Sequence, residues 1–172
     1  MPKTSSAALN FPKPSHDHAS CVAKALGAAE IACARQGALF TPLRRQVLEI
    51  VWGSHNPIGA YEILDALAEG GRRPAPPTVY RALDFLQAHG LVHRIESKNA
   101  YIGCSQRHEG GESGQFLICR ACGQTVEACD PDLAKAISQL AAASGFALES
   151  QTVELTGLCP SCSKGKDQHV QR

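Results

Sequence analysis

The sequence predicts an α+β protein of two units, a helical N-terminal unit that ends in a β-hairpin and a smaller C-terminal unit of strands and one helix. Apolar residues recur at helical spacing through residues 20–90, and two short β-prone runs follow at 91–104. The composition then changes to the Gly-, Ser- and charge-rich segment CSQRHEGGESGQ. We therefore expect a first domain over 19–104, a linker over 105–114 and a second domain over 115–163.

Four helices are expected in the first domain, each marked by an apolar stripe and by local start or stop signals. The first runs from Ser20 to a stop at Gly37, and the third covers roughly 59–69. The second has the sharpest beginning, because Thr41 can cap it and Pro42 fits its first turn. The fourth starts from the prolines of GGRRPAPP and ends at Gly90, and Trp52 is interpreted as a core residue.

A hairpin is predicted next, from the segment LVHRIESKNAYIGC with its polar Ser97-Lys98-Asn99 tip. If the hairpin is centred between Lys98 and Asn99, His93 lies opposite Cys104. Helices followed at once by such a hairpin predict a winged helix-turn-helix. The second domain is expected to contain strands over 115–118, 125–129 and 146–155, with a helix over 131–144.

Composition restricts the compartment and the class of partner. No run approaches the roughly eighteen apolar residues of a membrane helix, and the N-terminus lacks the apolar core of a signal peptide, so we expect a cytoplasmic protein without a membrane partner. Residues 1–18 are interpreted as a disordered arm and 164–172 as a polar tail. The net charge of +1 argues neither for nor against nucleic acid, but the basic excess is local to residues 72–94.

Two C-x-x-C pairs, separated by thirty-six residues, carry the clearest chemical signal: Cys119, Cys122, Cys159 and Cys162. Four thiolates around a tetrahedral centre suit zinc, and a closed four-cysteine shell leaves no position for catalysis. The alternatives are a thiol redox enzyme that uses one pair, and a zinc-stapled interaction module. The other cysteines in folded parts, Cys21, Cys33 and Cys129, are interpreted as small apolar fillers.

A second metal site is possible around the hairpin. His93, Cys104, His108 and Glu127 would clamp the hairpin and the linker to the second domain, so that metal occupancy could set the angle between domains. A thiolate in the set favours zinc over Fe²⁺ or Mn²⁺. The ordinary interpretation, a surface histidine and an unrelated buried cysteine, stays open.

DNA contacts are expected from the fourth helix. Thr78, Tyr80 and Arg81 lie near its N-terminus, and arginine is the side chain that most often reads guanine in the major groove. Arg72 and Arg73, just before the helix, would contact the phosphate backbone. The alternative is an amphipathic helix whose polar face is merely solvated.

The run PPTVYRALDFLQAHGLVHRIES, with TPLRRQVLEIV, AYEILDAL, CRACG and CPSC in the same order, resembles the ferric uptake regulator family and its zinc uptake regulator branch over about residues 20–162. This resemblance implies a homodimeric, zinc-dependent repressor of zinc-uptake genes that binds double-stranded operator DNA. It implies a winged-helix domain, a C-terminal dimerisation domain and about two zinc ions per chain. It implies neither an enzyme nor a small organic substrate.

Residue by residue, the resemblance assigns the four C-x-x-C cysteines to structural zinc. It assigns His93, Cys104 and Glu127 to the sensing site, and Tyr61 and Arg81 to base contacts. The second sensing histidine of this branch falls about where Glu112 stands, so His108 and Glu112 are both candidates for the fourth ligand. The paired histidines of iron-sensing members are absent, although a sensor of another divalent metal remains the alternative within the family.

Overall fold

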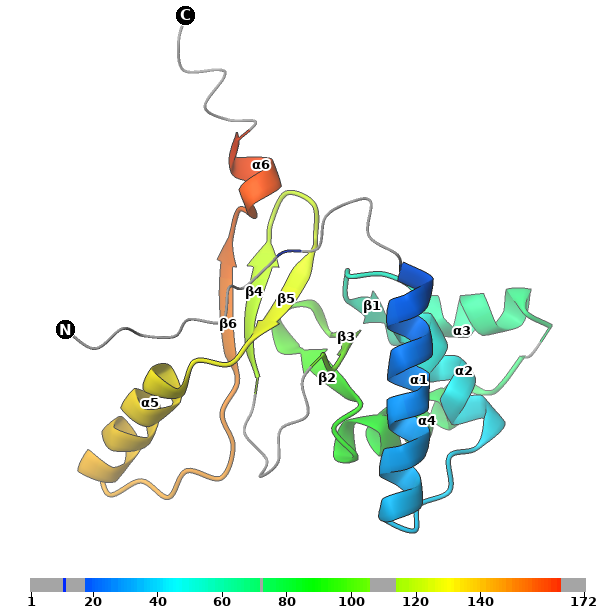
Figure 1. Ribbon diagram of the computed structural model, residues 1–172, viewed down its shortest axis with the longest axis horizontal. Helices are drawn as coiled ribbons and strands as arrows, with labels where there is room; N and C mark the ends of the chain where they lie inside the picture. The colour runs from blue at the N-terminus through cyan, green and yellow to red at the C-terminus, as the bar shows by residue number, and fades with distance from the viewer. Residues whose placement is uncertain (1–10, 12–17, 72, 106–113, 165–172) are drawn as a thin grey trace, which may run out of the picture. The chain divides into compact units, whose positions relative to one another are not determined.

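The computed structural model describes residues 11, 18–71, 73–105 and 114–164 (Figure 1). The chain divides into two compact units, the first over residues 12–107 and the second containing 108–172 together with Phe11. Both units mix helices with a three-stranded sheet, so the predicted α+β fold class is confirmed. None of the described helices is long and apolar enough to cross a membrane.

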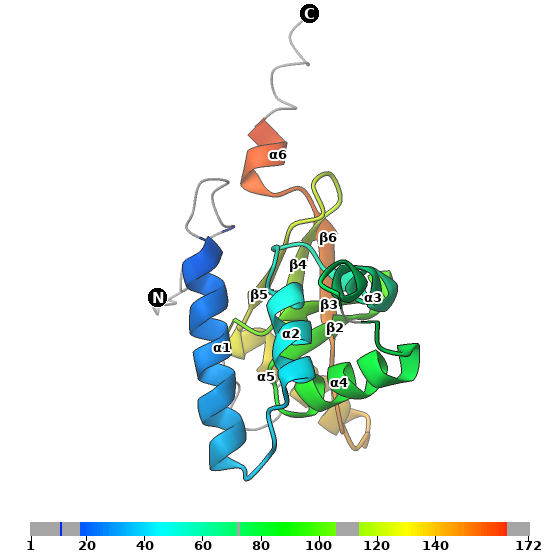
Figure 2. The same ribbon diagram turned by 90° about the vertical axis from the view of Figure 1, so that its right-hand side faces the viewer.

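The first unit is a winged helix-turn-helix, as predicted. Its elements are α1 (His18–Arg35), α2 (Pro42–Val51), β1 (Ile58–Gly59), α3 (Ala60–Glu69), α4 (Pro76–Ala88), β2 (Val92–Ile95), the 3₁₀ turn η1 (Glu96–Lys98) and β3 (Ala100–Gly103). Figure 2 shows the helices of this unit with the hairpin of β2 and β3. The two-residue strand β1 adds to the hairpin in the order β1-β3-β2, and it was not predicted because it is too short to show a pattern.

Local capping explains where the helices of this unit begin. Thr41 caps α2, and its hydroxyl accepts a hydrogen bond of 3.4 Å from the Arg44 backbone N–H. Glu62 closes the start of α3, because its carboxylate accepts from the Gly59 backbone N–H at 2.7 Å. The core is formed largely where α2 meets α4, by the fully buried side chains Val47, Leu48, Val51, Val79, Leu83 and Leu86.

The register of the hairpin differs from the prediction by two residues. His93 pairs with Ile102, not with Cys104. The turn occupies Glu96–Lys98 and Asn99, which takes a left-handed conformation at φ 46°, and this places the loop earlier in the chain than its polar tip suggested. Because side chains alternate along a strand, a shift of two residues keeps His93 and Cys104 on the same face.

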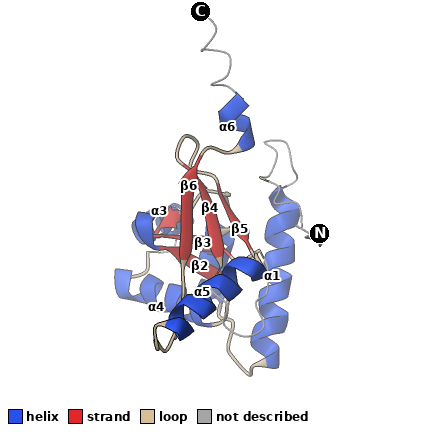
Figure 3. Cartoon of the chain, turned by 90° about the vertical axis from the view of Figure 1, so that its left-hand side faces the viewer, coloured by secondary structure: helices blue, strands red, loops and turns tan. Residues whose placement is uncertain are grey.

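The second unit contains β4 (Gln115–Cys119), β5 (Thr125–Ala128), α5 (Pro131–Ala143), β6 (Val153–Gly157) and the short α6 (Pro160–Lys164). Figure 3 shows the three strands side by side, in the order β5-β4-β6. β5 runs antiparallel to β4, whereas β6 runs parallel to it. The predicted strand over 146–155 was wrong in its first part, because β6 pairs only along the five residues that face β4. α6 was not predicted.

Candidate metal centres and nucleic-acid interface

The four cysteines of the two C-x-x-C pairs form one cluster. Their sulfur atoms all lie within 4.8 Å of one another, and the Cys122 and Cys159 sulfurs are 3.9 Å apart. Two thiolates bound about 2.3 Å from a tetrahedral zinc ion would be separated by about 3.8 Å. The donor set and its spacing therefore fit a four-coordinate zinc ion held by Cys119, Cys122, Cys159 and Cys162.

The parallel pairing of β4 with β6 brings the two pairs together. Cys119 ends β4 opposite Gly157 of β6, and the Arg120 backbone N–H donates to the Gly157 carbonyl at 2.9 Å. Gly123 then reverses the chain at φ 78°, a conformation that glycine adopts without strain. Both cysteine turns thus lie at the same end of the sheet, because parallel strands finish on the same side.

Hydrogen bonds and burial shift the pKa values of the clustered thiols in different directions. The Cys159 backbone N–H donates to the Cys119 sulfur at 3.3 Å, and this contact, with backbone hydrogen bonds from Cys122 and Ala121, lowers the pKa of the Cys119 thiol to about 6. Hydrogen bonding with the Cys159 and Cys122 sulfurs, together with burial, raises the pKa of Cys162 to about 12. The thiols of the cluster thus differ in how readily they ionise, and a zinc ion held by the four cysteines would stabilise all of them as thiolates.

Two of the predicted sensing residues lie together in the first unit. A ring nitrogen of His93 on β2 and the Cys104 sulfur lie within 4.8 Å of each other. Cys104 directly follows β3, and its backbone N–H donates to the Leu91 carbonyl at 3.1 Å, which continues the hairpin ladder by one bond. Both side chains are half-buried. An imidazole and a thiolate at this spacing can bind one zinc ion.

Glu127, the third predicted sensing residue, belongs to the second unit. It lies on β5 opposite Phe116 and is only 6% exposed. A side chain on Gly114 would come within 2.8 Å of its carboxylate, so that glycine allows the close approach. A buried carboxylate is costly unless it is hydrogen-bonded, paired with a charge or bound to a metal. His108 and Glu112, the two candidates for a fourth ligand, lie outside the described residues.

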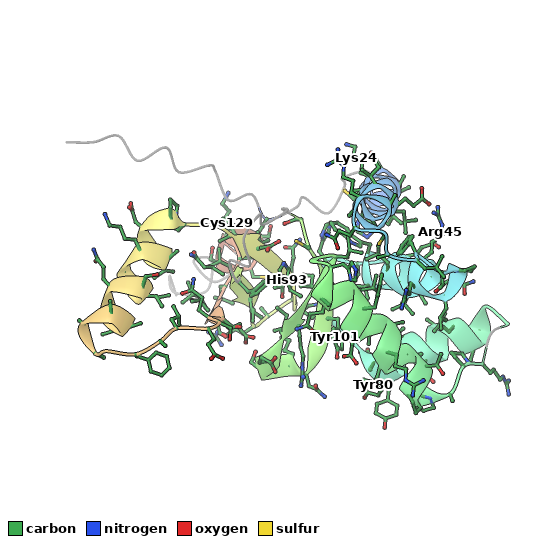
Figure 4. All side chains as sticks on the ribbon, turned by 90° about the horizontal axis from the view of Figure 1, so that it is seen from below. Lys24, Arg45, Tyr80, His93, Tyr101 and Cys129 are labelled. Atoms are coloured by element: carbon green, nitrogen blue, oxygen red, sulfur yellow. The ribbon has the colours of Figure 1, made fainter. Side chains whose placement is uncertain are left out.

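The predicted DNA contacts are exposed where the structure describes them. Thr78, Tyr80 and Arg81 all lie on the first two turns of α4, and Figure 4 shows Tyr80 pointing away from the ribbon. Tyr61 on α3 is 70% exposed, so its aromatic ring is accessible from solvent. Arg73 is also exposed. Arg72 lies outside the described residues.

The sequence did not reveal how the hairpin tip is held. Arg94 donates to the Asn99 side-chain oxygen at 2.9 Å and lies 3.3 Å from the Glu96 carboxylate.

The sequence also did not distinguish buried from exposed residues among the cysteines outside the metal sites. Cys33 is buried, which fits an apolar filler, whereas Cys129 is exposed, so the filler interpretation of Cys129 was wrong.

Three comparisons place the chain among known proteins. The sequence profile of the Ferric uptake regulator family matches residues 35–156. The Zinc uptake regulation protein of Escherichia coli (strain K12) is 39% identical over 137 residues, which cover 80% of each chain. The Zinc uptake regulation protein of Mycobacterium tuberculosis (strain H37Rv) is 33% identical and covers 60% of this chain and 78% of the relative.

Solved structures give the same result. A zinc uptake regulator complexed with zinc and DNA superposes with a TM-score of 0.80 at 37% identity, and the match covers 85% of this chain and 97% of that one. A crystal structure of holo XcZur superposes with a TM-score of 0.75 at 42% identity, covering 81% and 96%.

Proposed function

The chain belongs to the ferric uptake regulator family, in its zinc uptake regulator branch, and we propose that it is a zinc-responsive repressor of zinc-uptake genes that binds operator DNA as a metal-loaded homodimer. The observation that carries this proposal is the likeness to a zinc uptake regulator complexed with zinc and DNA. The proposed domains are a DNA-binding domain over 19–104 and a dimerisation domain over 115–163, which act in the cytoplasm.

Cys119, Cys122, Cys159 and Cys162 are the proposed ligands of a structural zinc ion. Their sulfurs are gathered within 4.8 Å, and four thiolates complete a tetrahedral shell with no position left for a substrate. Because the two pairs end β4 and follow β6, their common ion would fasten the end of the domain to its beginning. This role is one of stability rather than sensing.

His93, Cys104 and Glu127 are the proposed ligands of a second, regulatory zinc ion, with His108 or Glu112 as the fourth. A thiolate, an imidazole and a carboxylate suit zinc better than Fe²⁺ or Mn²⁺, which prefer nitrogen and oxygen ligands. Glu127 comes from the second unit and the other two from the first. Ligands from two units can share one ion only in a narrow range of arrangements, so filling this site would restrict how the two recognition helices of a dimer are presented.

α4 is the proposed recognition helix. Its N-terminus has two prolines and no side-chain cap, and its exposed Thr78, Tyr80 and Arg81 face solvent. Backbone N–H groups at a helix N-terminus suit phosphate contacts, whereas arginine suits guanine edges. Tyr61 would add a base contact from α3, and Arg72 and Arg73 would bind the phosphate backbone. If the polar face of α4 is merely solvated, changing these residues should leave DNA binding unaffected.

Replacing Arg81 with alanine is expected to relax the sequence preference at one base position in each half-site. The cost is about 1 to 3 kcal/mol for the preferred base, because a bidentate contact is lost there. Arg73→Ala should instead weaken all sequences alike and flatten the salt dependence. The matched control is Arg45→Ala, since Arg45 lies on α2 and pairs with Glu30 of α1. Unchanged base preferences in Arg81→Ala would exclude α4 as the reader.

The homodimer is proposed to form through the second unit. None of the thirteen residues of α5 is buried, although the helix carries Leu133, Ile137 and Leu140. Leu140 is 70% exposed, and Phe146 just beyond the helix is 65% exposed. Leu155 on the edge strand β6 is 50% exposed. Several large apolar side chains exposed in one small unit are typical of a protein–protein interface, and a second copy of the chain is the occupant that the family suggests.

Replacing Leu140 with aspartate is therefore expected to weaken the dimer. A charge buried in an apolar interface should cost about 2 kcal/mol or more, which is roughly a 30-fold increase in the dimer Kd. Sedimentation of the zinc-loaded protein measures the dimer Kd. Leu39→Asp is the matched control, because Leu39 is 74% exposed but belongs to the first unit. Equal dimer stability in the Leu140 and Leu39 variants would place the interface elsewhere.

The competing functions differ in how much zinc they need. A thiol redox enzyme requires an accessible low-pKa cysteine, but Cys119, whose pKa is lowered, is only 1% exposed. A zinc-stapled interaction module needs the four-cysteine site alone. Native mass spectrometry of the purified protein separates the three: about two zinc ions per chain supports the regulator, one the module and none the enzyme.

Selection of DNA fragments tests the proposed function itself. The zinc-loaded protein is incubated with a random duplex library, and the bound fragments are sequenced. A dimer that reads two major grooves should enrich inverted repeats whose half-sites are about 34 to 36 Å apart, or a multiple of that distance. Enrichment should vanish when a chelator empties the weaker zinc site. No enrichment with zinc present would contradict the proposal.

A further inference from the structure

The chain's single tryptophan lies against the residue that precedes Cys104. Trp52 follows α2, and Gly103 ends β3. A Cβ atom built on Gly103 would lie 2.2 Å from Cε2, 2.3 Å from Nε1 and 2.7 Å from Cδ2 of the indole. These distances are far below van der Waals contact, so the indole occupies the space that any side chain at position 103 would need.

Gly103 is therefore required for its size and not for its backbone conformation. Its φ lies outside the left-handed region that Gly90 and Gly123 adopt, so any residue could take this backbone. Only the close approach of Trp52 excludes a side chain. The contact fixes how closely the end of β3 approaches the helical core, because the indole packs on that core as well.

The two faces of the hairpin separate this contact from the metal ligands. Gly103 lies on the same face of β3 as Tyr101, which is part of the helical core. Cys104 alternates to the opposite face, where Ile102 is paired with His93. The indole thus holds the backbone from the core side, one residue before the thiol that lies within 4.8 Å of His93.

Trp52 is also tied to the recognition helix. Its backbone N–H donates to the Leu48 and Ile50 carbonyls, so the residue completes the last turn of α2. The buried face of α2 packs against α4 through residues that include Leu48 and Leu83. A displacement of Gly103 would therefore press on α2 and, through it, on α4.

We propose that Trp52, by packing on Gly103, is a positioning residue that sets the Cys104 thiolate for zinc and links it to the DNA-reading helix. The inference rests on the proposed regulatory site and adds a residue that does not touch the metal. Groups that orient metal ligands from outside the coordination shell typically affect metal affinity by about 10- to 100-fold.

A double-substitution experiment tests the contact. Gly103→Ala places a methyl group inside the indole and is expected to weaken zinc binding at the regulatory site by about 10- to 100-fold. Gly103→Ala combined with Trp52→Phe should recover much of that affinity, because the smaller ring leaves room for the methyl group while an aromatic side chain still packs on position 103. Zinc affinity is measured by competition with a chromophoric chelator, on protein whose four-cysteine site stays filled. Operator affinity at saturating zinc and the Tm show whether each variant remains folded.

Two further variants keep the test decisive if Gly103→Ala does not fold. Trp52→Phe retains an aromatic ring over Gly103 and should keep most of the zinc affinity, whereas Trp52→Leu should lose it at a similar Tm. Cobalt substitution supplies a readout that a purely structural role would not move: the thiolate-to-cobalt charge-transfer band of Cys104 should shift in Trp52→Leu and remain in Trp52→Phe. Since the chain has one tryptophan, wild-type emission should also change when zinc fills the regulatory site.

The outcomes separate this inference from the function on which it rests. If Cys104→Ser keeps wild-type zinc dependence, the proposed regulatory site is wrong. If Cys104→Ser loses the zinc response while Gly103→Ala and Trp52→Leu bind zinc like wild type, only the positioning role of Trp52 is overturned. A double variant no better than Gly103→Ala alone would also overturn it.

Discussion

The Cys119→Ser protein is expected to lose its tightly bound zinc and, with it, the folded second unit and the dimer. Structural zinc in small domains contributes about 10 to 16 kcal/mol of apparent binding free energy that is linked to folding. Cys119 is 1% exposed and ends β4, so its sulfur cannot be replaced without disturbing both cysteine turns. Circular dichroism, sedimentation and zinc content measure the loss.

Cys129→Ser is the matched control, because Cys129 is an exposed cysteine of the same unit that lies outside the four-cysteine cluster. The Cys129→Ser protein should retain its bound zinc, its fold and its dimeric state. Cys122→Ser, Cys159→Ser and Cys162→Ser should behave like Cys119→Ser. A Cys119→Ser protein that remained a folded dimer with undiminished zinc would show that the cluster does not hold a structural ion.

His93→Ala and Cys104→Ser are expected to give the second large effect, a folded and dimeric protein whose DNA binding no longer responds to zinc. Neither residue belongs to the four-cysteine cluster, and both lie at the end of the hairpin opposite its Glu96–Asn99 turn. Their loss should remove the coupling between metal and DNA, about 1 to 3 kcal/mol, and leave the fold intact. Operator binding against free zinc measures the coupling.

Cys21→Ser is the control for this pair, since Cys21 is a half-buried thiol of the same unit on α1. It should respond to zinc as wild type does. His108→Ala and Glu112→Ala, tested beside it, identify the fourth ligand as the one whose loss lowers zinc affinity. If both the His93 and Cys104 variants kept wild-type zinc dependence, the gate would lie elsewhere, and Cys129 would be the next residue to test.

Local signals in the sequence predicted most of the first unit. The Thr41 cap and the prolines at the start of α4 act through neighbouring residues, so short stretches of sequence contain all the information needed. The hairpin register depends on the turn over Glu96–Asn99, which ends with Asn99 in a left-handed conformation, and the polar tip did not reveal this turn. The predicted register was wrong by two residues, but this shift keeps His93 and Cys104 on one face. The expectation that they lie close together is therefore confirmed.

Features that depend on tertiary pairing could not be predicted. β6 is limited to the residues that face β4, although the β-prone run begins several residues earlier. For the sites, C-x-x-C spacing was enough to group four cysteines, because each pair is local and only the two pairs had to meet. The contact of Trp52 with Gly103 joins a helix end to a strand end, and the sequence of neither segment predicts this contact. The sequence predicts Trp52 only as a core residue.

Operator affinity as a function of free zinc tests the central claim most directly. The wild-type protein, with its four-cysteine site kept filled, is titrated against a selected operator duplex across a series of buffered zinc concentrations. We predict that affinity rises by about 5- to 150-fold as a second zinc ion binds, with the midpoint at the zinc affinity of the regulatory site. Equal operator affinity at all zinc concentrations, with one ion bound per chain throughout, would contradict a zinc-gated repressor.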